Sequence, residues 1–117
     1  MSSDLESLTP EKGVRMYLES RSKKITNITR KNHQYRLYQF IDFCDAQKID
    51  DLSNISADTL DQYFNNKKEK VNHYTLSNYL STLRVALDYW ASINAVEDGL
   101  RESVPMPDLN IGDEINE

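Results

Sequence analysis

The feature that most constrains the fold is an apolar stripe near the end of the chain. Steps of four, three, four and three residues separate Leu76, Leu80, Leu83, Leu87 and Trp90. Residues at this spacing lie on one face of an α-helix, so we predict a helix over residues 73–95. The stripe covers little more than two heptads, fewer than the roughly three to four that a coiled coil needs. We therefore expect this helix to be the central helix of a globular core.

The first half of the chain carries signals for two more helices. We predict one over residues 10–22, because Thr9 can cap it and Pro10 suits its first position. An apolar stripe with helical spacing predicts a second helix over residues 27–47. The residues that can begin this second helix are Thr26, Asn27 and Thr29.

A further helix is predicted over residues 56–66. Ser56 can cap it, with Ile55 and Leu60 placed as a hydrophobic staple. The polar stretch over residues 65–70 is then expected to be a loop. After this loop, Asn72 or Tyr74 can begin the helix that carries the apolar stripe.

These signals together predict an all-α fold with no sheet. The chain has only three glycines and three prolines, too few for the turns of a many-stranded sandwich or barrel. Its 117 residues suit one domain with one core. The residues expected in that core are Leu37, Phe40, Ile41, Leu60, Phe64, Leu80, Leu83, Leu87 and Trp90.

The expected domain organisation is one helical unit between two polar ends. Residues 1–8 form a flexible, acidic lead-in, and residues 9–104 form the helical domain. Residues 105–117 are expected to be a linker, because Pro105 and Pro107 stop a helix and four acids with no base follow them.

Several classes of site are excluded by composition. Cys44 is the only cysteine, so the chain can form neither an internal disulfide nor a cysteine-based zinc cluster, and we expect this residue in the core. His33 and His73 are the only histidines, which leaves no zinc-like set, and no Walker phosphate-binding pattern occurs. We therefore predict no metal and no cofactor. No run approaches the roughly 18 apolar residues of a membrane span, and we expect no membrane association.

The charges are unevenly distributed along the chain. The formal net charge is −5, yet residues 20–41 hold six cations and no acid, and residues 65–87 hold four cations and one acid. A polyanion responds to local potential within a Debye length of about 8–10 Å, so net acidity does not exclude a basic surface. We call residues 20–41 the first basic island and residues 65–87 the second. Charge alone equally allows each island to be an ordinary solvated helix surface.

Two blocks of sequence resemble the core-binding (SAM-like) domain of the phage-integrase family of tyrosine recombinases. Residues 29–49, TRKNHQYRLYQFIDFCDAQKI, are similar to the family's threonine and amphipathic helix with an "F..FC...gI" ending. Residues 74–90, YTLSNYLSTLRVALDYW, are similar to its "T...yLs.Lr.f..w" helix. The resemblance covers about residues 9–107. The chain departs from the family pattern at three positions, His33, Arg36 and Lys48, where the family often has an aromatic residue, an acid and a glycine.

This resemblance implies a four- to five-helix orthogonal bundle of the integrase N-terminal type. In such domains the second and fourth helices face the major groove, and a linker joins the bundle to a catalytic domain to form a C-shaped clamp around duplex DNA. The implied partners are double-stranded DNA, the catalytic domain of the parent chain and other recombinase protomers on DNA. The implied location is cytoplasmic, with the nucleoid.

The residues themselves point to the same surface. Phosphate oxygens are attracted to Lys and Arg side chains and to free amides at helix N-termini, and both basic islands adjoin a helix start. Polar side chains on the two helices can add base-edge contacts, although the sequence does not separate these roles. The predicted DNA-binding residues are Lys23, Lys24, Thr29, Arg30, Lys31, Gln34, Lys67, Lys68, Lys70, His73, Thr75, Asn78 and Arg84.

A catalytic role is not expected for this chain by itself. His33 and Arg36 spell the H-x-x-R of recombinase active sites, but here the motif lies inside the core-binding block, where Tyr35 is expected to pack the helix. In the family that motif belongs to a separate domain. Two other classes remain open from the sequence: a helical protein-interaction module and a small helix-turn-helix regulator, which would normally bind DNA as a dimer.

Overall fold

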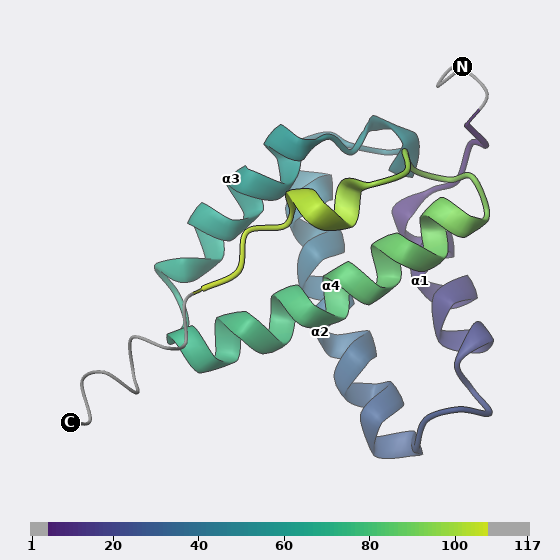
Figure 1. Cartoon of the computed structure of the whole chain (residues 1–117), viewed down its shortest axis with the longest axis horizontal. Coiled ribbons are helices and arrows are strands. Elements are labelled where there is room, and N and C mark those ends of the chain that lie inside the picture. Colours follow the sequence, from purple (N-terminus) through teal and green to yellow (C-terminus); the bar gives the residue numbers. More distant parts are fainter. Residues whose placement is uncertain (1–4, 108–117) are drawn as a thin grey trace.

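The computed structural model describes residues 5–107, which form four helices and two short 3₁₀ turns. The elements are α1 (Pro10–Ser20), α2 (Asn27–Ala46), η2 (Leu52–Asn54), α3 (Ala57–Lys68), α4 (His73–Ser92) and η3 (Leu100–Ser103). No strand occurs within this range, so the predicted all-α class is confirmed. In Figure 1, α4 passes in front of α2, with α1 on one side and α3 and η3 on the other.

Each of the four helices begins at a side-chain cap. The hydroxyl of Thr9 accepts a hydrogen bond from the Lys12 amide, and Ser56 forms a capping box with Thr59. Of the candidate starts, Thr26 caps α2 and Asn72 caps α4. Such caps satisfy one of the amides that a helix start leaves without a partner, at about 1 kcal/mol each.

The helix α3 differs from its predicted extent. It continues to Lys68, whereas residues 65–70 were expected to form a loop. The reason is packing. The side chain of Lys67 is buried between helices, so this polar stretch contains one more helical turn that packs against the core. The ends of α1 and α4 fall two and three residues short of those predicted, at Ser20 and Ser92.

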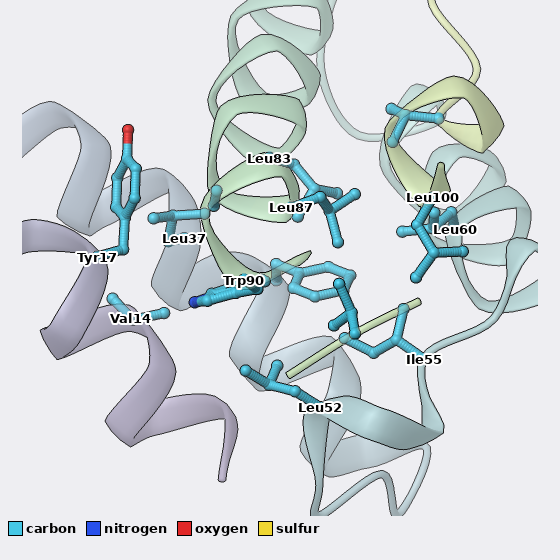
Figure 2. Close-up of a cluster of buried hydrophobic side chains, with 14 of the residues drawn as sticks. Val14, Tyr17, Leu37, Leu52, Ile55, Leu60, Leu83, Leu87, Trp90 and Leu100 are labelled. Atoms are coloured by element: carbon cyan, nitrogen blue, oxygen red, sulfur yellow. The ribbon is translucent and has the colours of Figure 1, made fainter. Parts of the chain in front are cut away.

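The core is organised around Trp90, whose side chain is fully buried (Figure 2). The indole Nε1 donates a hydrogen bond of 2.8 Å to the carbonyl oxygen of Gly13, which ties α4 to α1. Cys44 is also buried, and burial raises the pKa of its thiol to about 12. The predicted residues that prove buried are Leu37, Phe40, Leu60, Leu80, Leu83, Leu87 and Trp90.

Two packing predictions are wrong. Ile41 and Phe64 are only half-buried against the core, whereas Tyr35 does pack against Tyr79 of α4 although it is 60% exposed. Ile41 borders an open hollow beside α1, and Tyr63 takes the interior position in place of Phe64, packing edge-on against Phe40 with ring centroids 5.0 Å apart. Helical spacing identifies the apolar side of a helix, but a shift of one residue decides which side chain is central.

The described part of the expected lead-in is held against the bundle. The amide of Glu6 donates to the carbonyl of Asn94 at 2.7 Å, and the amide of Leu8 donates to the Asp51 carboxylate at 3.1 Å. At the other end, Met106 packs against the core, and residues 108–117 of the expected linker lie outside the described range. No helix in the described range combines the length and hydropathy needed to cross a bilayer.

We expect Gly13→Ala to destabilise the fold. A Cβ at this position would lie 2.5 Å from Leu52 Cδ1 and 3.1 Å from Trp90 Nε1, and both neighbours are buried. Overpacking of a core costs about 1–3 kcal/mol. The gain in helix propensity from glycine to alanine is about 1 kcal/mol, so loss should prevail. Urea unfolding measures the change, and an increase in the free energy of unfolding would contradict this close approach of α1 to Trp90.

Candidate nucleic-acid interface

The helix α2 carries its charges in the order opposite to the one that stabilises a helix. Cations occupy its first half, at Arg30, Lys31 and Arg36, and Asp42 and Asp45 lie near its end. Its first turn has no acid and its last turn has no base. The helix dipole favours the reverse placement by roughly 0.3–1 kcal/mol for a charge in a terminal turn, which here applies to Arg30 and Asp45. The charges in the terminal turns of α2 therefore do not stabilise this helix through its dipole.

Of the neighbouring helices, α3 follows the dipole rule at both ends, and α1 follows it only at its start. Glu11 lies in the first turn of α1, while α3 has Asp58 in its first turn and Lys67 and Lys68 in its last. The last turn of α1 holds Glu19 and no base, so α2 differs from both neighbours in its cationic beginning, whereas an acidic end occurs in α1 as well. A cationic helix start favours binding of an external anion, because the anion interacts with side chains and free amides together.

The helices α2 and α4 also begin in the same way. Residues 26–29 read Thr-Asn-Ile-Thr and residues 72–75 read Asn-His-Tyr-Thr. In both, the cap side chain accepts from the amide of the third helical residue, Thr29 at 3.1 Å and Thr75 at 2.8 Å. The first two amides of a helix have no partner within the helix, so each start presents amides that can donate to phosphate oxygens.

The predicted residues of the first island divide between open surface and a groove. Lys23, Lys24 and Lys31 are exposed. Arg30 and Gln34 line an open groove of about 440 Å³ between α1 and α2. Two cations on α1, Lys12 and Arg15, line this groove as well. The sequence prediction did not include them, although their three-residue spacing on α1 places them on one side of that helix.

In the second island the structure removes one residue from the surface. Lys67 is 9% exposed, its ammonium donates to Gln39 Oε1 at 2.9 Å, and it lies 4.8 Å from the centre of the Tyr79 ring. Burial lowers its pKa. Lys67 therefore links α2, α3 and α4, whereas Lys68 and Lys70 remain exposed.

The predicted residues of α4 lie on two sides of the helix. Arg36 donates to Thr82 Oγ1 at 3.2 Å, which marks the side of α4 that faces α2. At 100° per residue, Thr75 and Asn78 lie on this side. His73 and Arg84 lie on the other side, roughly 120° or more away from Asn78. The structure therefore brings Thr75 and Asn78 toward α2 and does not do so for His73 and Arg84.

A cationic cluster at the junction of α1, α2 and α4 was missed in the prediction. His33 Nδ1 and the Tyr17 hydroxyl are hydrogen-bonded at 3.1 Å, and the Arg21 guanidinium lies 5.7 Å from the centre of the Tyr17 ring. Arg36 completes the cluster beside His33. Burial lowers the pKa of His33, and the charges of Arg36 and Arg21 lower it further. Arg21 and Arg36 belong to the first basic island, and that was the available signal.

We expect the cluster to make stability depend on pH. Because its pKa is lowered on folding, His33 takes up a proton less readily in the folded chain than in the unfolded chain. The free energy of unfolding should therefore fall as pH decreases through the unfolded-state pKa of about 6.5, and should be retained above it. His33→Gln should lose less stability than the native chain between pH values of about 7.5 and 5.5. Equal losses in urea titrations at the two pH values would contradict this account.

Comparison with known proteins gives two matches, and both are to the N-terminal domain of phage integrases. Residues 4–96 match the family model described as phage integrase, N-terminal SAM-like domain. The chain is also similar to the crystal structure of the N-terminal domain of a phage integrase/site-specific recombinase from Haloarcula marismortui, with a TM-score of 0.84 and 28% identity. That match covers 87% of this chain and 99% of the other. No curated protein matches the chain at a significant level.

Proposed function

Because this chain belongs to the phage integrase N-terminal SAM-like domain family, we propose that it binds duplex DNA in a sequence-directed manner through α2 and α4. The observation that carries the proposal is the reversed charge order of α2, which places Arg30 and Lys31 at a capped helix start. This arrangement is unfavourable for an isolated helix and favourable once a phosphate group lies against it.

The surface for this contact combines charge with hydrogen-bond donors. Lys23, Lys24 and Lys31 supply exposed ammonium groups around the start of α2. Thr75 and Asn78 lie on the side of α4 that faces α2, where their side chains can reach sugar or base edges. Phosphate contacts set position and base contacts set sequence preference, and both kinds of donor are present on this surface.

The proposed partners follow from the family. Residues 9–104 act as the DNA-binding unit, and the chain from residue 105 leads toward a catalytic domain, so that the two units clamp the duplex. Further recombinase protomers assemble on the same DNA. The protein then works in the cytoplasm, with the nucleoid.

Electrophoretic mobility shift with duplex DNA at two salt concentrations tests the proposal. A protein with about four phosphate contacts loses on the order of a hundredfold in affinity between about 50 and 200 mM salt, because binding releases counterions. We expect a loss of this size. Absence of a shift, or binding that does not change with salt, would instead favour a helical protein-interaction module.

We further propose that this chain does not cleave or join DNA by itself. His33 of the H-x-x-R motif is hydrogen-bonded to Tyr17, and Arg36 is hydrogen-bonded to Thr82. Both side chains thus join helices of the bundle. Incubation with a suicide DNA substrate should give no covalent protein–DNA product, and a tyrosine-linked adduct would overturn this proposal.

A further inference from the structure

Three large apolar side chains of the described residues are strongly exposed, and all three lie on the two proposed DNA-binding helices. Ile28 is 74% exposed, Tyr35 is 60% exposed and Tyr74 is 71% exposed. The first two belong to α2, and the third lies at the start of α4. Exposed apolar surface has a cost in water of about 25 cal/mol per Å². The presence of all three exposed side chains on α2 and α4 therefore suggests that a partner covers some of them.

Ile28 and Tyr35 form one stripe along α2. They are seven residues apart, close to two helical turns, so they point in nearly the same direction and lie about 10 Å apart along the helix axis. The Tyr35 ring packs edge-on against the Tyr79 ring, with centroids 6.3 Å apart. This contact positions Tyr35 without burying it.

The surroundings of the stripe identify what can cover it. Lys24 and Lys31 are exposed on either side of Ile28 along the chain, and no acid occurs between residues 20 and 41. A protein surface that matched these charges would have to be both apolar and acidic. The major groove of DNA offers phosphates at its edges and, at its floor, one kind of apolar group, the C5-methyl of thymine.

We propose that Ile28 and Tyr35 each contact a thymine C5-methyl group and thereby set part of the sequence preference. This inference rests on the proposed function, because it needs α2 in the major groove. Each base-pair step rises 3.4 Å along the duplex axis and covers more than that along the groove, so two contacts about 10 Å apart span at most about three base-pair steps. The preferred duplex should therefore carry two thymines within this spacing.

Replacement of thymine by uracil tests the proposal, because it removes the methyl group and leaves charge and hydrogen bonding unchanged. Tightly bound duplexes are first selected from a random pool with the full chain. Each thymine of the selected duplex is then replaced singly by uracil, and affinity is measured by mobility shift. At two positions we expect a loss of about fourfold, the effect of one buried methyl group.

Side-chain variants assign the two positions. Ile28→Ala should lose its sensitivity to uracil at one position and keep it at the other, and Tyr35→Ala should show the converse. Tyr74→Ala, an equally exposed residue outside the stripe, should keep both sensitivities. Because all three side chains are exposed, the variants should fold, and circular dichroism melting checks this.

The outcomes separate this inference from the function on which it rests. Salt-dependent DNA binding with no effect of uracil at any position would overturn the methyl contacts and leave DNA binding standing. No binding to any duplex would overturn both. If uracil has no effect and Ile28→Ala dissociates a dimer in sedimentation, the stripe is a protein contact and the proposal fails.

Discussion

Replacing Trp90 by alanine is expected to lower the free energy of unfolding by about 3–5 kcal/mol. The side chain is fully buried in the cluster shown in Figure 2, and its Nε1 holds the hydrogen bond to Gly13. The variant would lose that bond and leave a cavity where α4 meets α1. Since small domains have about 5–15 kcal/mol of stability in total, urea unfolding should detect a large shift of the midpoint.

The matched control is Tyr74→Ala, which truncates another large aromatic residue on the same helix. Tyr74 is 71% exposed, so the expected change is within about 0.5 kcal/mol. If the two variants lose similar stability, Trp90 is not the centre of the core. A loss below about 1 kcal/mol in the Trp90 variant would also contradict the described packing.

The second large effect is expected in DNA binding. Lys24 and Lys31 are both exposed and flank the start of α2. Each phosphate contact contributes about 0.9 to the slope of log K against log salt, so replacing both lysines by alanine should flatten the slope by about 1.8. Affinity should fall by a similar amount on unrelated duplexes, because phosphate contacts carry no sequence information directly. Mobility shifts over a salt series measure both quantities.

Lys48→Asn supplies the control for lost positive charge. Lys48 lies just beyond the opposite end of α2, and its backbone is left-handed, with φ of 62°, a conformation that asparagine tolerates. This variant should keep the native slope. Lys12 would be a poor control, because it lines the same groove as Arg30. If Lys48→Asn flattens the slope by about half as much as the double lysine variant, the loss per charge is the same, and binding is diffuse and not centred on α2.

The sequence predicted those parts of the fold that depend on local pattern. The spacing from Leu76 to Trp90 identified α4 and its buried face, and Thr9 and Ser56 marked helix starts correctly. The left-handed backbone at Lys48 also explains why the resembling family often has glycine there, since glycine adopts this conformation without strain.

The candidate site was less predictable because it depends on contacts between helices. Lys67 has the charge of a surface residue, yet Gln39 and Tyr79, distant in sequence, enclose its ammonium. Arg36 likewise donates its hydrogen bond to Thr82 only because α2 and α4 pack together in the fold. The sequence shows which residues are cationic, but tertiary packing determines whether each of them faces solvent.

The charge order of α2 also bears on how the domain approaches DNA. The cations of α2 (Arg30, Lys31 and Arg36) and its acids (Asp42 and Asp45) are centred about 11 residues apart, which at 1.5 Å per residue is about 17 Å, roughly two Debye lengths at physiological salt. Its basic beginning and acidic end therefore act on a polyanion independently. An encounter with the acidic end leading is repelled, and one with the basic end leading is attracted, so the domain is oriented before contact. The association rate should thus exceed that expected from a net charge of −5, and should decline as salt rises.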